Sequence, residues 1–269
     1  MMCLPTCRSA RAGLALAVVL AAPCALAAPP TGEGGGTVAE IIDGATLRLD
    51  DGGVVRLVGI DAPEPPPGRS SRGRWPHEAE ARAALEAFAL GKRVILLQDG
   101  TREDRHGRRL AHVHVVGAGG EEDLWLQGEM LKRGLARVHL AEDNRALAAE
   151  MLAIERAARA ARRGLWAERI YRVRTPEEAA ADADSFQLVE GTVYAAAIVS
   201  GRGYLNYGPD RHTDFTVVLS PRVRRLMRDA GVDMNMLAGR RIRVRGWIML
   251  RDGPMIELTC PEAIELMEE

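Results

Sequence analysis

Two strand-like runs joined by a tight turn constrain the fold of this chain more than any other feature. Residues 46–49 lead into Asp50-Asp51-Gly52-Gly53, a sequence typical of hairpin turns, and residues 54–60 lead out of it. The returning run reads Val-Val-Arg-Leu-Val-Gly-Ile-Asp-Ala-Pro-Glu, so an arginine and two carboxylates follow the turn closely. We therefore expect a β-hairpin that carries a group of charged side chains.

A second charged segment, Asp104-Arg105-His106-Gly107-Arg108-Arg109, follows later in the chain. Together with the hairpin it supplies a carboxylate cluster and two arginines for one phosphate group. Arginine suits such a site because its planar guanidinium matches two phosphate oxygens and keeps its charge at any working pH.

These segments, with Asp43-Gly44-Ala45-Thr46 before the hairpin, resemble the core of the staphylococcal (micrococcal) nuclease family, also called thermonuclease-like. The pattern Asp-Gly-x-Thr, Arg-Leu-x-Gly-Ile-Asp-x-Pro-Glu and Asp-Arg-x-Gly-Arg is long and ordered. The resemblance covers most of residues 37–168, where Gly-Leu-Ala-Arg-Val and a final Gly-Leu-Trp are further landmarks. It implies an OB-type five-stranded barrel with appended helices, and metal-assisted hydrolysis of nucleic-acid phosphodiesters.

The resemblance assigns catalytic and substrate-binding roles to particular positions. It makes Arg56 and Arg108 the arginines that bind the phosphate and stabilise the transition state, and it puts Glu64 at the position of the general base. His106 stands where the family usually has a tyrosine beside the nucleotide, and the tyrosines expected after residue 136 are missing. Because stacking on an aromatic ring is worth roughly 1–3 kcal/mol per base, we expect weaker substrate binding than in typical members.

The calcium site departs from the family pattern at one position. The resemblance makes Asp61 and the backbone carbonyl of Ala62 calcium ligands, with Asp43 nearby as an acid that shapes the metal pocket. Where the family has a metal-binding aspartate, this chain has Ala45. Calcium affinity depends on the charge count of the ligands, so we expect Ca²⁺ binding to be weakened or lost.

The first 27 residues have the features of a secretory signal peptide. Arg8 and Arg11 give a basic start, residues 13–22 are apolar, and Ala25-Leu26-Ala27 is typical of a cleavage site. Lipid attachment at Cys24 is the rival interpretation, and the proline before it argues against that. No other segment approaches the roughly 20 apolar residues of a transmembrane helix. We therefore expect a periplasmic or secreted protein without stable membrane insertion.

The remaining chain divides by composition into two β-rich domains. We expect a mainly β protein with some α (α+β), in which an OB-type barrel of the staphylococcal nuclease kind precedes a second OB-like β-barrel. In the first domain, helical patterns occupy residues 76–90, 128–133 and 144–163. The expected boundaries are a signal peptide at 1–27, a flexible leader at 28–36, the nuclease-like domain at 37–172, a linker at 173–185 and the OB-like domain at 186–269.

The second domain has strand-like runs near residues 188–198, 204–207, 215–219, 241–249 and 255–259. A helical stretch near 221–230 lies between the third and fourth runs, as in an OB fold. Arg241, Arg243 and Arg245 fall on one face of the fourth run. They form either a nucleic-acid-binding face or an outer face paired with carboxylates, and the second interpretation is the more ordinary one.

Charge and cysteine content exclude some functions. The net charge is −1, so any attraction for nucleic acid must come from local arginine clusters. Cys260 is the one cysteine outside the signal, which excludes an internal disulfide and a cysteine-based zinc site.

Two functions remain open on the sequence. The first is a monomeric, exported nuclease that acts on DNA or RNA and is weakened by Ala45. The alternative is a catalytically inactive module of the same fold that binds nucleic acid or protein. The residue at position 45 separates the two hypotheses.

Overall fold

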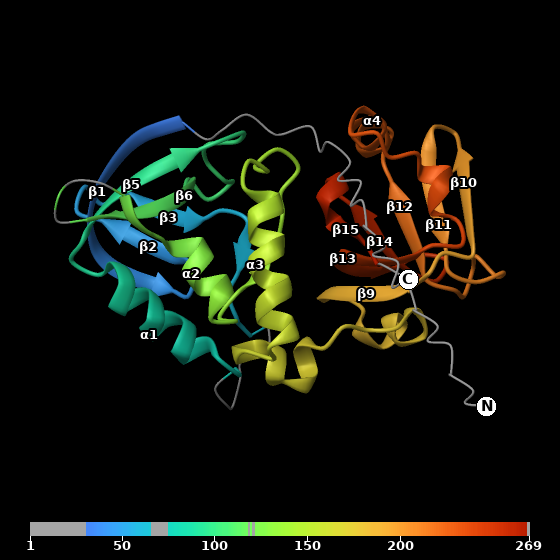
Figure 1. Cartoon of the computed structure of the whole chain (residues 1–269), viewed down its shortest axis with the longest axis horizontal. Coiled ribbons are helices and arrows are strands. Elements are labelled where there is room, and N and C mark those ends of the chain that lie inside the picture. The colour runs from blue at the N-terminus through green and yellow to red at the C-terminus, as the bar shows by residue number, and fades with distance from the viewer. Residues whose placement is uncertain (1–30, 66–74, 118, 120–121, 268–269) are drawn as a thin grey trace, which may run out of the picture.

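The computed structural model describes residues 31–65, 75–117, 119 and 122–267 (Figure 1). The signal peptide expected from the sequence lies outside these residues. Two β-domains follow one another along the chain, and helix α3 (Ala148–Ala160) lies between them (Figure 1). In the described part of the chain, no helix is long and apolar enough to cross a membrane.

Five strands of the first domain pair in a closed ring. The antiparallel pairs are β1 with β2, β2 with β3, β5 with β6 and β1 with β5, and the parallel pair β3 with β6 closes the barrel. The strands are β1 (Thr31–Asp43), β2 (Thr46–Leu49), β3 (Val54–Leu57), β5 (Arg93–Gln98) and β6 (Arg109–Val116). A further strand, β7 (Glu122–Trp125), pairs with β6. The barrel expected for this region is confirmed.

The hairpin formed by β2 and β3 follows the alternation of its sequence. Leu47 lies opposite Val55 in the register, and both side chains are fully buried in the barrel core. The neighbouring pair, Thr46 and Arg56, lies on the other face of the hairpin. The sequence alternation therefore directs the arginine of the candidate site out of the barrel core.

The α-helices described in the first domain are α1 (Glu78–Ala89), α2 (Leu126–Lys132) and α3. Helix α1 buries Ala81, Leu85 and Ala89, which recur every four residues on one face. It ends before Gly91, whose φ of 73° suits glycine at the end of a helix. Each helix falls inside or beside a range expected from the sequence.

The leader expected to be flexible is partly a strand. Residues 31–36 belong to β1, and Gly35 and Gly36 pair with Ile95 and Val94 of β5. Gly35 has a φ of 155°, and a Cβ there would lie 2.2 Å from the carbonyl oxygen of Val94. The glycines that suggested flexibility instead let β1 approach β5 closely, so the expectation was wrong for these residues.

The linker expected at 173–185 is also ordered. Short 3₁₀ helices connect the domains: Gly164–Ala167, Arg169–Tyr171 and Pro176–Asp182. Thr175 and Glu178 form a capping box at the start of the last one. Arg174 is buried, and its Nε lies 2.5 Å from Oδ2 of Asp182. These contacts fix the connection between the two domains.

The second domain repeats the strand order of the first. β10 (Ala195–Val199), β11 (Arg202–Asn206) and β12 (Thr216–Leu219) pair in sequence, and β12 pairs in parallel with β14 (Pro254–Leu258). β14 pairs with β13 (Arg241–Leu250), which returns to β9 (Phe186–Thr192). A short strand, β15 (Ile264–Leu266), also pairs with β13.

Strands β9 and β10 are the two halves of the single run expected at 188–198, separated at Val193 and Tyr194. Helix α4 (Pro221–Asp229) follows β12, as the OB-like pattern required. A one-turn 3₁₀ helix, η4 (Met234–Leu237), then leads toward β13.

Candidate functional site

The candidate site is built where the chain enters and leaves the β2–β3 hairpin. Arg56 projects from β3, and its Nη1 lies 3.7 Å from Oδ1 of Asp43 at the end of β1. Its Nη2 lies 3.6 Å from Oδ1 of Asp61 in β4 (Ile60–Asp61). One guanidinium thus sits between two carboxylates, at distances longer than direct hydrogen bonds.

Glu64 is the most exposed member of this group, yet its environment shifts its titration. Partial desolvation by the surrounding protein raises the pKa of the Glu64 carboxyl, and the negative charges of Asp61 and Asp43 add to the increase. The positive charges of Arg56 and Arg108 oppose it. Five of the residues singled out from the sequence therefore lie close enough to act on one another electrostatically.

Arg108 is oriented by its own loop. Its Nε donates to Oδ2 of Asp104 at 2.6 Å, while Oδ1 of Asp104 accepts the backbone N–H groups of His106 and Arg108. Desolvation raises the pKa of Asp104, but these hydrogen bonds and the positive charge of Arg108 together have the larger effect. The pKa of Asp104 therefore lies below its ordinary value. The loop turns at Gly107, whose φ is 72°. Asp104 therefore acts as a fixed anion that aims the arginine.

His106 is exposed in the same loop. Its Nε2 accepts a hydrogen bond from Nε of Arg105 at 3.1 Å. Its hydrogen bonds lie within its own loop, so its substrate-binding role stays a prediction.

The turn that holds Ala45 is tightly packed. Ala45 is fully buried, and its backbone N–H donates to Oδ1 of Asp43 at 2.7 Å. A Cβ on Gly44 would lie 2.8 Å from the Cβ atoms of Ala62 and Ala81, so α1 packs directly on this turn. The carboxylate of Asp43 thus accepts a hydrogen bond within the turn itself, and position 45 carries no carboxylate.

These residues do not fit the calcium site that the family implies. Ala45 provides no ligand oxygen, and both oxygens of Asp61 face arginines. Across the described residues, no group of three or more histidine, cysteine, aspartate or glutamate side chains could hold a metal ion. A divalent cation would have to displace guanidinium groups from the carboxylates that are left.

Arg137 is part of the site and was missed by sequence reasoning. It lies in β8 (Arg137–Val138), directly opposite Asp61 of β4 in the register. Its Nη2 donates to Oδ2 of Asp61 at 3.2 Å, and its Nη1 donates to the carbonyl of Phe186 at 2.9 Å. The signal was present in Gly-Leu-Ala-Arg-Val, which marked the family but suggested no role for its arginine.

The second domain reaches this site through one aromatic residue. The ring of Phe186 lies 5.1 Å from the Arg137 guanidinium and 4.6 Å from the ring of His139. Burial lowers the pKa of His139, while the charge of Asp61 raises it and nearby arginines lower it. The rings of His139 and Phe186 thus lie together beside Asp61.

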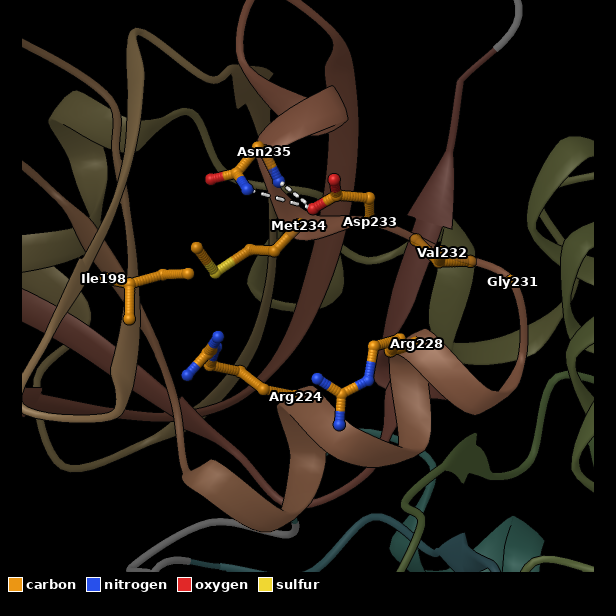
Figure 2. A pocket seen from close by; sticks show the side chains of 8 residues that line it. All are labelled: Ile198, Arg224, Arg228, Gly231, Val232, Asp233, Met234 and Asn235. Carbon is orange, nitrogen blue, oxygen red and sulfur yellow. Dashed lines mark hydrogen bonds between the residues drawn. The ribbon is translucent and has the colours of Figure 1, made fainter.

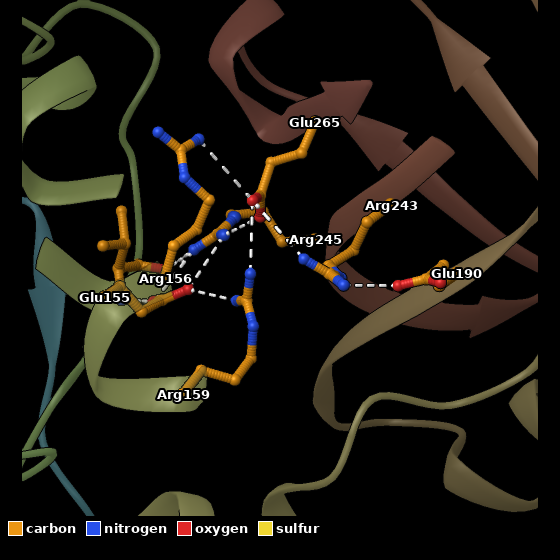
Figure 3. A network of polar contacts seen from close by, with 8 residues as sticks. Glu155, Arg156, Arg159, Glu190, Arg243, Arg245 and Glu265 are labelled. Atoms are coloured by element: carbon orange, nitrogen blue, oxygen red, sulfur yellow. Dashed lines mark hydrogen bonds and ion pairs between the residues drawn. The ribbon is translucent and has the colours of Figure 1, made fainter. Parts of the chain in front are cut away.

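The three arginines of β13 do not form an exposed nucleic-acid face. Arg245 is 3% exposed, and its Nη2 lies 3.0 Å from Oε1 of Glu155 in α3 and 2.5 Å from Oε1 of Glu265 in β15 (Figure 3). Arg243 and Arg241 both pair with Glu190 of β9.

The three arginines pair with carboxylates, as the second interpretation had it, and around Arg243 and Arg245 these pairs form a buried network between the domains. The physical reason is that α3 packs against this face of β13 and supplies Glu155, which is fully buried. The carboxylate partners come from β9, α3 and β15, which supply Glu190, Glu155 and Glu265.

Two cavities occur away from the candidate site. One of about 300 Å³ is lined in part by Leu96, Arg102 and Arg109 of the first domain. Another, of about 360 Å³, lies in the second domain (Figure 2). The charged side chains around Glu64 line neither of them.

Comparison with known proteins agrees with this arrangement. Residues 54–168 match the family described as "Staphylococcal nuclease homologue". "Protein ParB" of Escherichia coli is 35% identical over 167 residues, which cover 59% of this chain and 84% of ParB.

Two relatives are named as endonucleases. "Probable endonuclease LCL3" of Schizophyllum commune is 35% identical over 46% of this chain and 43% of its own length. "SPbeta prophage-derived endonuclease YokF" of Bacillus subtilis is 30% identical over 50% of this chain and 45% of its own length. The chain thus spans less than half of either endonuclease, and it belongs to the staphylococcal nuclease family.

Proposed function

We propose that this protein binds nucleic-acid phosphodiesters through Arg56 and Arg108 and hydrolyses them slowly, with Glu64 as the general base. One observation carries the proposal. In a member of the staphylococcal nuclease family, two arginines and three carboxylates act on one another around Glu64. DNA or RNA is the substrate class that the family implies.

The chemistry assigns a separate task to each side chain. A carboxylate with a raised pKa is a stronger base than an ordinary glutamate. Glu64 therefore takes a proton from the water that attacks phosphorus. Arg56 and Arg108 stabilise the charge that develops on the non-bridging oxygens.

Arg56 is available for this role because its contacts with Asp43 and Asp61 are long, at 3.7 and 3.6 Å. A phosphate has two oxygens for one guanidinium and forms shorter charge-assisted hydrogen bonds. Binding of substrate then exchanges weak ion pairs for stronger ones.

Calcium should contribute less to hydrolysis here than in family members that have an aspartate at position 45. A bound calcium ion supplies further charge stabilisation when present. Asp61 and the Ala62 carbonyl are the ligands that remain, and Arg137 already neutralises Asp61. We therefore propose that calcium is held weakly or not at all, and that turnover is slow for this reason.

A second candidate function is a binding module without catalysis. The observation in its favour is that Ala45 and the arginine-paired Asp61 leave no complete metal site. Such a module would keep phosphate binding at Arg56 and Arg108 and lose hydrolysis.

We further propose that the protein is exported as a monomer to the periplasm or the medium. The support is the basic, apolar and Ala-Leu-Ala pattern of residues 1–27. Intact-mass analysis of the protein recovered outside the cytoplasm should show a chain that begins at Ala28. A chain that retains Arg8, or that carries lipid on Cys24, would refute this part of the proposal.

Incubation of the purified protein with labelled single- and double-stranded DNA and RNA tests the catalytic proposal. Calcium, magnesium and a chelator are compared in parallel. We expect slow cleavage that Glu64→Gln and Arg108→Ala abolish and that Arg82→Ala, an exposed change on α1, leaves intact. Binding without cleavage in every condition would favour the module instead.

A further inference from the structure

A cavity in the second barrel has the features of a small-molecule site. Its volume of about 360 Å³ lies near the lower end of the range of ligand pockets, about 300–1,000 Å³. It opens between helix α4, strand β10 and the 3₁₀ helix η4 (Figure 2). The residues that line it include Ile198, Arg224, Arg228, Asp233, Met234 and Asn235.

Helix α4 brings two guanidinium groups to this cavity without neutralising them. Arg224 and Arg228 are four residues apart and therefore lie on one face of the helix. Arg224 donates from Nη1 to the carbonyl of Gly201 at 2.6 Å, and its buried Nε has no hydrogen-bond partner. Among the described residues, neither arginine pairs with a carboxylate, whereas Arg222 of the same helix pairs with Glu142.

This arrangement of charges destabilises helix α4 when the cavity holds no ligand. Like charges four residues apart destabilise a helix, and an unpaired buried donor adds its desolvation cost. An anion held by both guanidinium groups would remove both costs. The charge pattern of the cavity therefore favours a negatively charged ligand.

Ile198 and Met234 add apolar surface to the lining of the cavity. Ile198 is 46% exposed, while Met234 is buried. A Cβ on Gly203 would lie 2.3 Å from Sδ of Met234 and 3.0 Å from Cδ of Arg224, so a glycine in β11 is required for both side chains to pack here. The ligand is thus expected to have an apolar part beside its anionic group.

The acidic residue among those that line the cavity, Asp233, is hydrogen-bonded to its neighbour Asn235. Oδ1 of Asp233 accepts the backbone N–H of Asn235 at 2.9 Å and its side-chain amide at 3.1 Å. In Figure 2 this carboxylate is turned toward Asn235, while the two guanidinium groups lie on the other side of the cavity. Asp233 is therefore not the partner of either arginine.

We propose that this cavity binds a small phosphate-bearing molecule of the mononucleotide class. The phosphate is held by Arg224 and Arg228, because guanidinium groups match phosphate oxygens in charge and geometry. The apolar face of the ligand packs on Ile198 and Met234. This proposal does not depend on whether the first barrel cleaves nucleic acid.

Calorimetric titration with thymidine 5′-monophosphate tests the proposal. The full chain carries Arg56→Ala and Arg108→Ala, so that the first barrel does not bind the phosphate. We expect one binding site per chain, and thymidine without its phosphate should bind at least about tenfold more weakly. Inorganic phosphate alone should also bind more weakly, because it lacks the apolar part.

Arg228→Glu provides the decisive variant, since its guanidinium makes no hydrogen bond or ion pair with any described residue. It should weaken binding of the monophosphate by about tenfold or more. Arg225→Glu is the matched control, because Arg225 lies on the same helix and does not line the cavity. Unchanged thermal unfolding of both variants verifies that they fold.

Three results would overturn the proposal. The first is absence of binding when Arg56 and Arg108 are replaced. The second is equal weakening by Arg225→Glu and Arg228→Glu, which would indicate general attraction to a basic helix. The third is equal affinity for thymidine and its monophosphate.

Discussion

Both barrels of this protein close through a parallel pair of strands, β3 with β6 in the first and β12 with β14 in the second. In the first barrel, Arg56 lies in this pair and Arg108 directly precedes it. In the second barrel, the paired segments Thr-Val-Val-Leu and Pro-Met-Ile-Glu-Leu carry no basic residue.

Three arginines of the second barrel lie on β13, where other elements cover Arg243 and Arg245. Helix α3 provides Glu155, and β15 provides Glu265, so that Arg245 is almost completely buried (Figure 3). Arg56 has only long contacts with its carboxylates. The comparison shows that strand order does not decide what a charged face does. The carboxylates of the elements packed against that face decide it.

Of the changes considered, removal of Arg245 should have the largest effect on stability, and it tests whether the buried network joins the two barrels. Arg245→Ala leaves Glu155 and Glu265 buried without their main partner, which should lower the free energy of unfolding by about 3–5 kcal/mol. Urea unfolding measures the change. Arg241→Ala, whose side chain is 64% exposed, should cost only about 0–1 kcal/mol. Similar costs for both variants would show that the network does not hold the domains together.

A carboxylate introduced at position 45 tests the metal site of the first barrel. The parent's thermal stability should respond to calcium weakly or not at all. Ala45→Asp should be less stable in chelator, because position 45 is fully buried beside Asp43. Calcium at a hundred times its dissociation constant should then return about 2.7 kcal/mol. Ala45→Asn is the uncharged control, and a calcium-insensitive Ala45→Asp variant would contradict the metal-site argument.

Arg137 connects the two domains, because it contacts Asp61 in the first and Phe186 in the second. Arg137→Met removes donors to the Asp61 carboxylate and the Phe186 carbonyl, so it should cost about 1.5–3 kcal/mol of stability. Chemical denaturation is again the measurement. Arg93→Met, an exposed change at the start of β5, is the control. No difference between the two would mean that the second barrel does not support the site through Arg137.

Glu64→Gln should have the smallest effect, and its sign depends on pH. A raised pKa means that the folded protein disfavours ionised Glu64, so the carboxylate costs stability at neutral pH. The neutral glutamine should therefore raise the melting temperature slightly at pH 7. Below the ordinary glutamate pKa of 4.5, the carboxyl is protonated in both states and the gain should disappear. A lower melting temperature at pH 7 would contradict the electrostatic description of the site.

The local parts of the fold could be predicted from the sequence because they depend on neighbouring residues. The β2–β3 hairpin follows from its turn and its alternation, and the capping box at Thr175 follows from residue types three apart. The grouping of Arg56, Asp61 and Glu64 came from an ordered motif. These features need little information about the rest of the molecule.

The parts that could not be predicted depend on packing between distant segments. The partners of Arg245 come from α3 and β15, which no local pattern connects with β13. Arg137 joins the site because β8 pairs with β4 across the barrel. Gly35 lies in the segment expected to be a flexible leader, although its missing Cβ is what lets β1 approach β5.

Single-turnover cleavage of a labelled oligonucleotide, with the protein in excess, tests most directly whether Arg56 and Arg108 of the first barrel stabilise the transition state of hydrolysis. Arg56→Ala should slow cleavage by about 10²–10³-fold, because it removes a donor that stabilises the developing charge. Arg241→Ala in the second barrel should leave the rate unchanged. A wild-type rate in Arg56→Ala, or an equal loss in Arg241→Ala, would contradict the assignment of catalysis to the first barrel.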